Sequence, residues 1–281
     1  MLLKDFLPHP SVREFVRCYR IVHLHFDTKD SIPSKAYPPK PETILHFFLK
    51  DRFAIQWQNG AKVNQPPITL IGQRTAITTQ YTGRNFLNFQ IVFQPTALFR
   101  LTGIPNYELT DKCIDAEFVF AENSKPVFEL LQYAKSYEEM LLAGENFVRT
   151  LINKARNNFH CLDTVAGHML YKDGNLTLDW LAKEACLCTK QFKRKFYERV
   201  GVNPKLLARI IRFNKAYNIK NKYPANDWLR IAIECGYYDY QHLAKDYKAF
   251  TGVTPNEFHL LESKSPERTL GLADVLYQTR I

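Results

Sequence analysis

Apolar and polar residues alternate in two different ways along the 281-residue chain. Before about Pro95, short runs of β-branched and aromatic residues are separated by proline and glycine, which is typical of antiparallel strands joined by turns. After Pro95, apolar residues recur every three or four positions, which indicates helices. The pattern therefore predicts an α+β multidomain chain, with an N-terminal β domain and an all-helical C-terminal domain.

The N-terminal strands are expected to form one compact domain. Several short strands with turn signals and no helical pattern between them favour an antiparallel barrel or a sandwich. We expect an antiparallel β-barrel with helices over residues 1–120. Its strands are expected at 19–26, 43–49, 68–71, 77–81 and 86–93, with a first helix at 96–101.

A helical connector is expected over residues 121–159. Its two helices are predicted at 125–133 and 137–156, and a domain boundary at Asn157–Asn158. The second helix carries one apolar stripe at helical spacing. Two interpretations remain open, because this stripe either packs on the barrel or forms a dimer interface. The stripe consists of Leu141, Gly144, Val148, Leu151, Ile152 and Ala155.

The rest of the chain is predicted to be helices and short turns over 160–263, followed by a loose tail over 264–281. Thr177 is expected to cap the second helix of this part. A corner at Cys186–Cys188 precedes the third helix, and Pro204 and Pro255 each open a helix, since proline is tolerated in a first turn. The helices are expected at 162–171, 178–185, 189–199, 204–222, 228–235 and 239–250, with a short one from Pro255.

One helical unit occurs twice in this part. Gly201-Val-Asn-Pro204 returns as Gly252-Val-Thr-Pro255 at an offset of 51, and Leu181-Ala182 returns as Ile231-Ala232 at an offset of 50. The two copies thus differ by one residue where a turn is expected. A duplicated helical unit on a basic chain suggests that the protein binds a ligand with a fixed repeat, and duplex DNA is such a ligand.

The positive charge concentrates around the first copy. The net charge is +10. Residues 178–215 hold only three acids, Asp179, Glu184 and Glu198. Such a cluster favours phosphate binding, because neutralising phosphates releases condensed counterions. The same window holds ten Lys or Arg residues, at positions 183, 190, 193, 194, 195, 199, 205, 209, 212 and 215.

Both copies meet the requirements of a helix-turn-helix, namely an apolar seam, a tight turn and an exposed polar face on the second helix. Arg194 suits guanine or phosphate, and Gln241 suits adenine. The helix expected between the copies is about 28 Å long, close to the ~34 Å between successive major-groove faces. Base contacts are expected from Lys190, Lys193, Arg194, Tyr240, Gln241 and Lys245, and phosphate contacts from Lys183, Thr189, Lys195, Lys205, Arg209, Arg212 and Lys248.

The second copy, Ile231-Ala-Ile-Glu-Cys-Gly-Tyr237 through Thr251-Gly-Val-Thr-Pro255 and Phe258, resembles the signature of AraC/XylS-type transcription regulators. The resemblance covers about Leu162 to Leu260 and implies two recognition helices with the same base-facing positions. It also implies a cupin-like N-terminal domain that senses a small molecule and helps the protein to dimerise, with double-stranded DNA and RNA polymerase as partners.

Three departures from the family pattern lead to further expectations. Cys186 stands where members often have glycine, and Cys188 where they usually have serine. Thr189 is therefore expected to cap the first recognition helix in place of Cys188. Asp246 places an acid beside Lys245, so the second recognition helix is expected to bind the more weakly of the two.

The effector pocket is expected at Tyr19, Trp57, Gln90 and Phe93, although two other functions of the barrel stay open. The barrel could serve only for dimerisation or protein interaction. Alternatively, it could be a metal-dependent cupin enzyme, because His23 and His25 share a strand face and His46 lies on another strand. The glycines of the metal-cupin motif are missing, and the acids that follow are Asp27 and Asp30. We therefore expect no catalytic residues, metal or cofactor, and no enzyme activity.

The remaining composition is that of an ordinary cytoplasmic protein. Hydrophobic residues make up 46% of the chain and charged residues 23%. No run is long and apolar enough for a membrane span or a signal peptide. The six cysteines are scattered and do not suggest a disulfide framework or a zinc site.

Overall fold

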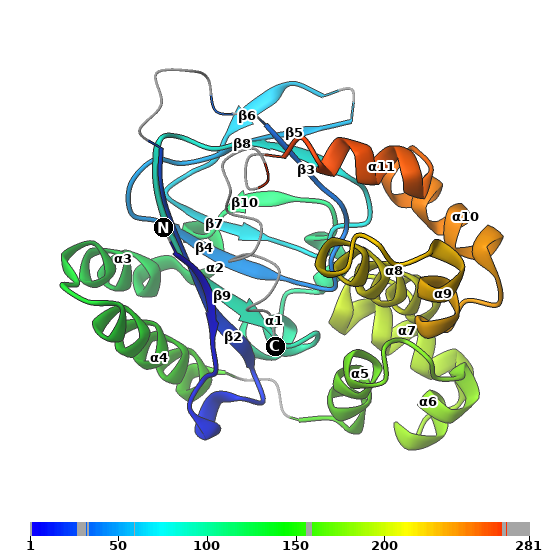
Figure 1. Ribbon diagram of the computed structural model, residues 1–281. Helices are drawn as coiled ribbons and strands as arrows, with labels where there is room; N and C mark the ends of the chain where they lie inside the picture. Colours follow the sequence, from blue (N-terminus) through cyan, green and yellow to red (C-terminus); the bar gives the residue numbers. More distant parts are fainter. Residues whose placement is uncertain are drawn as a thin grey trace.

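The computed structural model of the protein describes residues 2–26, 32, 34–58, 60–155, 159–265 and 268. Figure 1 shows strands gathered in the N-terminal part and helices beside them in the C-terminal part. The predicted α+β division of the chain is therefore confirmed. The expected boundary at Asn157–Asn158 and most of the expected tail lie outside the described residues.

All strand pairs in the N-terminal part are antiparallel and form two sheets. The larger has the order β1-β2-β9-β4-β7-β10 and the smaller the order β3-β8-β5-β6. The ladders between the described strands do not close into one barrel, so of the two predicted alternatives the structure has the sandwich. The strands are β1 (Leu2–Phe6), β2 (Val16–His25), β3 (Lys35–Tyr37), β4 (Ile44–Phe48), β5 (Ala54–Trp57), β6 (Lys62–Asn64), β7 (Ile68–Ile71), β8 (Thr78–Tyr81), β9 (Asn85–Phe93) and β10 (Cys113–Asp115).

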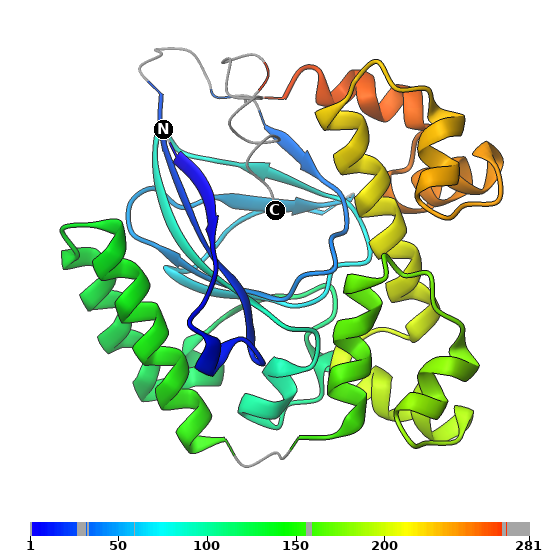
Figure 2. The same cartoon turned by 60° about the horizontal axis from the view of Figure 1, so that its bottom comes forward.

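The larger sheet has two differently covered faces. Side chains alternate along each strand, so β2, β4 and β9 send every second residue to each face. One face packs under the helices α3 and α4 (Figure 2), and the other faces the smaller sheet. The helical segments here are η1 (Pro10–Val12), α1 (Ala97–Thr102), η2 (Asn106–Glu108), α2 (Glu117–Phe120), η3 (Ala121–Asn123), α3 (Ser124–Tyr133) and α4 (Tyr137–Lys154).

The apolar stripe of α4 packs on the sheet. A Cβ atom at Gly144 would lie 2.5 Å from the Phe89 ring, so glycine is what allows the close approach. Val148 and Leu151 are buried in the same core. Of the two interpretations of this stripe, packing on the N-terminal domain is therefore the correct one for these residues. Leu142, on the outer side of α4, is exposed.

The predicted helices of the C-terminal part agree with the structure to within one residue at each end. They pack around two cores, and α8 contributes Leu207 and Ile211 to the first and Ile210 and Phe213 to the second. The helices are α5 (Cys161–Tyr171), α6 (Leu178–Glu184), α7 (Thr189–Val200), α8 (Pro204–Lys222), α9 (Trp228–Glu234), α10 (Tyr240–Thr251) and α11 (Pro255–Glu262).

The repeated Gly-Val-x-Pro phrase ends one helix and begins the next in both copies. Gly201 and Gly252 have φ of 92° and 81°, the left-handed conformation that closes a helix. Asn203 then accepts a hydrogen bond from the Leu206 amide, and Thr254 accepts one from the Glu257 amide. Each proline occupies a first helical turn, where its missing N–H has no helical partner to lose.

Among the described residues, no helix has the length and apolar character needed to span a membrane.

Candidate nucleic-acid interface

The first helix-turn-helix is formed by α6 and α7. Thr177 caps α6 by accepting a hydrogen bond from the Trp180 amide, as predicted. The corner passes through Cys186, which has a left-handed φ of 54°. Cys188 is the N-cap of α7 without a side-chain hydrogen bond, and Thr189 is the first residue of the helix. The expectation that Thr189 caps this helix is therefore wrong.

The outer face of α7 is cationic. Phe192 and Phe196 are buried on the inner side of the helix. Lys190, Lys193 and Arg194 are exposed and, at spacings of three and four, share one face. These three cations are therefore presented together to solvent.

Lys195 lies at the side of this face. It is half-buried, and its Nζ lies 3.5 Å from Nε2 of His160, the N-cap of α5. Burial and the charges of Lys195 and Arg199 lower the pKa of His160, so the ring is a neutral neighbour for the ammonium group near pH 7.

The second helix-turn-helix is formed by α9 and α10. Gly236 turns the corner at a φ of 77°. Asp239 caps α10 by accepting a hydrogen bond from the His242 amide. Gln241 and Lys245 are exposed, whereas Tyr240 is half-buried against the second core. This outer face is more weakly charged than that of α7 and carries one amide suited to a base edge.

Asp246 does not face outward with Lys245. Its carboxylate is buried. It accepts a hydrogen bond of 2.9 Å from Arg209 Nε and one of 3.1 Å from the Tyr237 hydroxyl. The expectation that Asp246 adds an acid beside Lys245 on the outer face is therefore wrong, because the helix turns this residue toward Arg209 of α8. Burial, followed by the Asp246 charge, raises the pKa of Tyr237, which keeps its hydroxyl protonated as a donor.

The residues expected at phosphates fall into two groups. Lys183, Lys205 and Lys248 are exposed. The Arg209 guanidinium, by contrast, is bound to Asp246 and lies 5.2 Å from the Phe250 ring centre. Arg212 lies 5.3 Å from the Tyr237 ring centre, and Thr189 is half-buried. The two arginines hold α8 against α9 and α10. The number of cationic residues in this segment did not indicate that role.

A family model described as a helix-turn-helix domain matches residues 181–260, the segment that contains both units. The chain carries an AraC-type helix-turn-helix domain. A second model, described as a domain of unknown function, matches residues 4–115. A comparison with curated proteins gives no match.

A comparison with solved structures finds ToxT and CuxR among the similar chains. ToxT from Vibrio cholerae O395 has 12% identity and a TM-score of 0.45, with 90% of this chain and 99% of that chain covered. Unsaturated fatty acid bound ToxT from V. cholerae strain SCE256 has 13% identity and a TM-score of 0.45, with 86% and 94% covered. The AraC-like transcriptional activator CuxR has 12% identity and a TM-score of 0.28, with 78% and 88% covered.

The AraC-type domain is docked on the sheet domain through the end of α7. Tyr107 of η2 stacks on Tyr197, and Nδ2 of Asn106 donates a 2.6 Å hydrogen bond to the Arg199 carbonyl. The Thr110 hydroxyl donates a 2.8 Å bond to the carbonyl of Gly201. These residues were not expected as functional, because no sequence pattern pairs positions about 90 apart.

Tyr197 belongs to the cationic face of α7. It follows Lys190 by seven residues, Lys193 by four and Arg194 by three, which are the spacings of one helix face. The sheet domain therefore covers the C-terminal end of the face that carries these cations. This contact connects the two domains directly at a recognition helix.

The second unit also touches the sheet domain. Ala36 and Ile77 pack against the core formed around α10. Lys35 Nζ lies 3.9 Å from a carboxylate oxygen of Glu262 in α11. Both units are thus held in one arrangement relative to the sheets, with α8 running between them (Figure 2).

The four residues expected to line an effector pocket lie on two different faces. Tyr19 and Phe93 are buried in the core beneath α4, and the Tyr19 hydroxyl donates to Glu145. Trp57 packs in the core between the sheets. Gln90, opposite Arg20 and His46 in register, belongs to the other face of β9 from Phe93. Because side chains alternate along a strand, the sequence alone places Gln90 and Phe93 on opposite faces of β9. It does not indicate which of the two faces a helix covers.

The histidines expected for a metal-dependent cupin do not converge. His23 lies on the face beneath α4, with Nδ1 2.8 Å from the Tyr137 hydroxyl. His46 points between the sheets, where its Nδ1 lies 3.0 Å from Asn88 Nδ2. Asp27 and Asp30 lie outside the described residues. Within the described part of the chain, no three His, Cys, Asp or Glu side chains group as a metal site.

Proposed function

We propose that the protein is a sequence-specific transcription regulator that inserts α7 and α10 into two successive major-groove segments of one DNA duplex. The observation that carries the proposal is that a single 19-residue helix, α8, connects the two units whose exposed faces lie on α7 and α10. At 1.5 Å per residue this helix is about 28 Å long, near the ~34 Å repeat of the groove.

The two faces have different roles in this proposal. Lys190, Lys193 and Arg194 supply the stronger charge, and Arg194 can bind guanine through two hydrogen bonds. On α10, Gln241 can bind adenine, with Tyr240 and Lys245 beside it. The exposed Lys183, Lys205 and Lys248 would contact phosphates, together with Thr189, Lys195, Arg209 and Arg212 at the edges of the faces.

The sheet domain would control this activity through its contact with α7. A duplex held along the whole cationic face would need the space that Tyr107 occupies beside Tyr197. Docking of the sheet domain and full insertion of α7 therefore compete, and a small molecule bound to the sheet domain would shift the balance. The second candidate is a sheet domain that only dimerises or binds another protein.

We also propose that the regulator is a cytoplasmic homodimer that acts with RNA polymerase. Support for the dimer comes from large apolar side chains exposed on the outer side of α2, α3 and α4. Phe118 and Tyr133 are 87% and 82% exposed, and Leu130 and Leu142 lie on the same group of helices. Exposed apolar groups that gather in one region are typical of interaction surfaces.

Selection of bound sequences from random duplexes tests the proposal. The expected result is a site with two preferred blocks about one helical turn apart. The double variant Arg194→Ala and Gln241→Ala should lose both preferences while staying folded. Retention of the same sequence preference by this variant would contradict the assignment of α7 and α10 as the recognition helices.

A further inference from the structure

The inner face of the larger sheet carries a row of polar side chains along its middle. The strand register places four residues opposite one another across β2, β9, β4 and β7. Residues paired in this way lie on one face of a sheet, here the face toward the smaller sheet. All four are buried, and they are Arg20, Gln90, His46 and Thr69. Facing layers of a sandwich usually fill this space with apolar side chains, so a polar row here needs hydrogen-bond partners.

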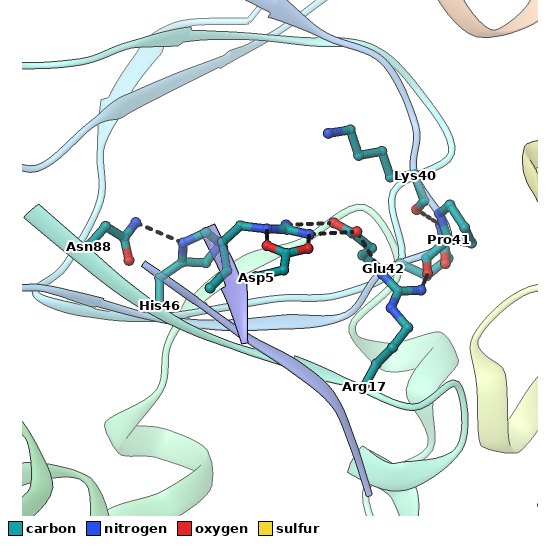
Figure 3. Close-up of polar contacts among 9 residues, drawn as sticks. Asp5, Arg17, Lys40, Pro41, Glu42, His46 and Asn88 are labelled. Atoms are coloured by element: carbon teal, nitrogen blue, oxygen red, sulfur yellow. Dashed lines mark hydrogen bonds and ion pairs between the residues drawn. The ribbon is translucent and has the colours of Figure 1, made fainter. Parts of the chain in front are cut away.

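Two polar atoms of this inner face have no hydrogen-bond partner. Asn88 Nδ2 lies 3.0 Å from His46 Nδ1 (Figure 3). Burial, followed by the charges of Arg74 and Arg20, lowers the pKa of His46 to about 3, so the ring is neutral. Because an amide nitrogen only donates, Nδ1 accepts and the proton of the ring lies on Nε2. His46 Nε2 and Asn88 Oδ1 are both buried without a partner, so this pair of residues offers one donor and one acceptor.

The segment after β7 adds a buried cation. The Arg74 side chain is buried and donates a 2.9 Å hydrogen bond to the Thr78 hydroxyl. Thr78 lies opposite Trp57 in register, and Trp57 packs in the core between the sheets. After burial, the Arg74 charge is the main cause that lowers the pKa of His46 on the opposite sheet. The guanidinium therefore lies between the two sheets, near the His46 ring.

Among the described residues, no carboxylate lies within ion-pair distance of Arg74. Glu42 and Asp111 act on it electrostatically from farther away. Glu42 is bound by Arg17 at 2.6 Å and by Arg20 at 3.2 Å (Figure 3). Burial lowers the pKa of Arg74, as expected for a cation without a close counter-charge. Because the hydrogen bond described above uses a single N–H, other donors of the guanidinium are available to a ligand.

Two amides lie on the same inner faces. Gln80 of β8 lies opposite Ile55, which packs between the sheets, and Gln90 belongs to the row on the larger sheet. Both amide side chains are buried, and within the described part of the chain neither makes a hydrogen bond. An amide presents both donors and acceptors, so these two groups suit either oxygen atoms or hydroxyl groups of a ligand.

We propose that the interior of the sandwich binds a small hydroxy acid. Its carboxylate accepts hydrogen bonds from Arg74 and from His46 Nε2, and its hydroxyl donates to Asn88 Oδ1. Gln80 and Gln90 satisfy its remaining oxygen atoms. A carboxylate fits better than a neutral group, because it neutralises a buried cation and makes charge-assisted hydrogen bonds. A hydroxyl fits the free acceptor better than an ammonium group, which the guanidinium would repel.

The segment that carries Arg74 also contacts the loop that docks α7. The amide and the hydroxyl of Thr75 both donate to the Asp111 carboxylate. The neighbouring Thr110 donates to the Gly201 carbonyl at the end of α7. A ligand that holds Arg74 in place should therefore favour the docked arrangement and lower DNA affinity. This effect on DNA rests on the proposed function, whereas binding of the acid does not.

Isothermal titration of the full chain without DNA tests the site. The probes are three hydroxy acids of increasing size, lactate, malate and mandelate, each paired with the acid that lacks the hydroxyl, namely propionate, succinate and phenylacetate. At least one hydroxy acid should bind, and its partner without the hydroxyl should bind roughly tenfold more weakly. The diol 1,2-propanediol, which lacks a carboxylate, should not bind.

Variants of two residues separate binding from folding. Arg74→Gln should weaken acid binding by roughly tenfold to hundredfold, because charge-assisted hydrogen bonds are lost. Without acid its unfolding temperature should be equal to or above that of the native chain, since a buried cation is removed. Asn88→Leu should make the affinities for the hydroxy acid and its partner equal. Arg52→Gln, which removes an exposed arginine of the same domain, should leave binding unchanged.

Four outcomes would overturn the proposal. They are no binding of any of the three hydroxy acids, equal affinities of the native chain for an acid with and without the hydroxyl, unchanged affinity in Arg74→Gln, and a lower unfolding temperature of that variant without acid. DNA binding is measured in a separate titration. A hydroxy acid that binds without changing DNA affinity would count against the proposed control by the sheet domain and not against the site.

Discussion

Tyr107 of η2 stacks on Tyr197 of α7, with ring centres 5.2 Å apart and ring planes inclined by 10°. Tyr197 lies on the helix face that carries Lys190, Lys193 and Arg194. One aromatic pair thus connects the sheet domain to the helix surface proposed to enter DNA. Under the proposed function this contact breaks when α7 inserts fully into the groove. The free energy of the contact therefore opposes DNA binding.

Replacing Tyr107 by alanine should therefore strengthen DNA binding. An aromatic pair contributes about 0.5–1.5 kcal/mol beyond its buried area, so affinity should rise by roughly twofold to tenfold. Fluorescence anisotropy with a selected duplex measures the change. Tyr171→Ala removes an exposed tyrosine at the end of α5, outside the proposed dimer surface, and should have no effect on DNA binding. An unchanged or weaker affinity of Tyr107→Ala would argue against competition between docking and DNA.

Single substitutions on the two recognition helices should each affect one half of the site. Arg194→Ala and Gln241→Ala should each cost about 1–3 kcal/mol and relax the base preference at one block only. Lys205→Ala should weaken binding evenly across sequences and lower the salt slope by about one. Loss of preference at both blocks from one substitution would contradict this division.

The helix boundaries of the C-terminal part could be predicted from sequence, because residues close to each boundary determine it. The helices of the AraC-type domain begin at Thr177, Asn203, Asp239 and Thr254, whose side chains cap them, and two end at the glycines of the repeated phrase. Such signals lie within four residues of the boundary that they set.

Other features depend on residues distant in the chain and could not be predicted. The strand β1 contains Lys4 and Asp5, so its own pattern does not indicate a strand, and among the described strands it pairs with β2 alone. Whether Tyr19 or Arg20 faces the space between the sheets depends on where α4 packs. The orientation of Asp246 toward Arg209 and the docking of Tyr107 on α7 likewise come from packing between segments.

The two corners of the repeat should respond oppositely to exchange of glycine and cysteine. Cys186 and Gly236 are equivalent and both have positive φ, a conformation that costs an L-residue about 1–2 kcal/mol. Cys186→Gly should stabilise the protein slightly, because the relief of strain is partly offset by glycine's greater freedom when unfolded. Gly236→Cys should destabilise it by about 1–2 kcal/mol or more, since a Cβ atom would also lie 2.3 Å from Asn175 Oδ1. Urea midpoints compare the two, and equal shifts would exclude backbone strain as the cause.

Asp246→Asn should lower stability without improving DNA binding. The substitution weakens hydrogen bonds from Arg209 and Tyr237 that involve a charged acceptor, each worth about 1.5–3 kcal/mol. Thermal unfolding measures the loss. An acid lying at the DNA would instead repel phosphates, so its removal would raise affinity. A rise in affinity would show that Asp246 faces the duplex.

The buried His46 should make the stability of the sheet domain depend on pH. Burial, followed by the charges of Arg74 and Arg20, lowers the pKa of His46 from 6.5 to about 3. Above pH 6.5 the ring is neutral in both the folded and the unfolded chain, so its contribution is complete. As pH falls below 6.5 the unfolded chain binds the proton first, which should cost about 2 kcal/mol by pH 5.

Chemical unfolding of His46→Gln at pH 7 and pH 5 isolates this contribution. The variant should lose less stability between these two values than the native chain. Glu42, whose pKa is also lowered, acts below about pH 4.5 and does not overlap with this window. An identical pH dependence of both proteins would show that folding does not lower the pKa of His46.

The sharing of α8 between two cores fixes the rotation of one unit relative to the other. Each residue of a helix adds 1.5 Å and turns the chain by about 100°, so inserting a single residue in α8 would point α10 away from the face of the duplex that α7 is proposed to meet. Under the proposed function, substitutions on α7 or α10 change which bases are preferred, but substitutions alone do not alter the distance between the two blocks of the site. Proteins that descend from this chain should therefore recognise sites that differ in base sequence but have the same spacing between the two blocks.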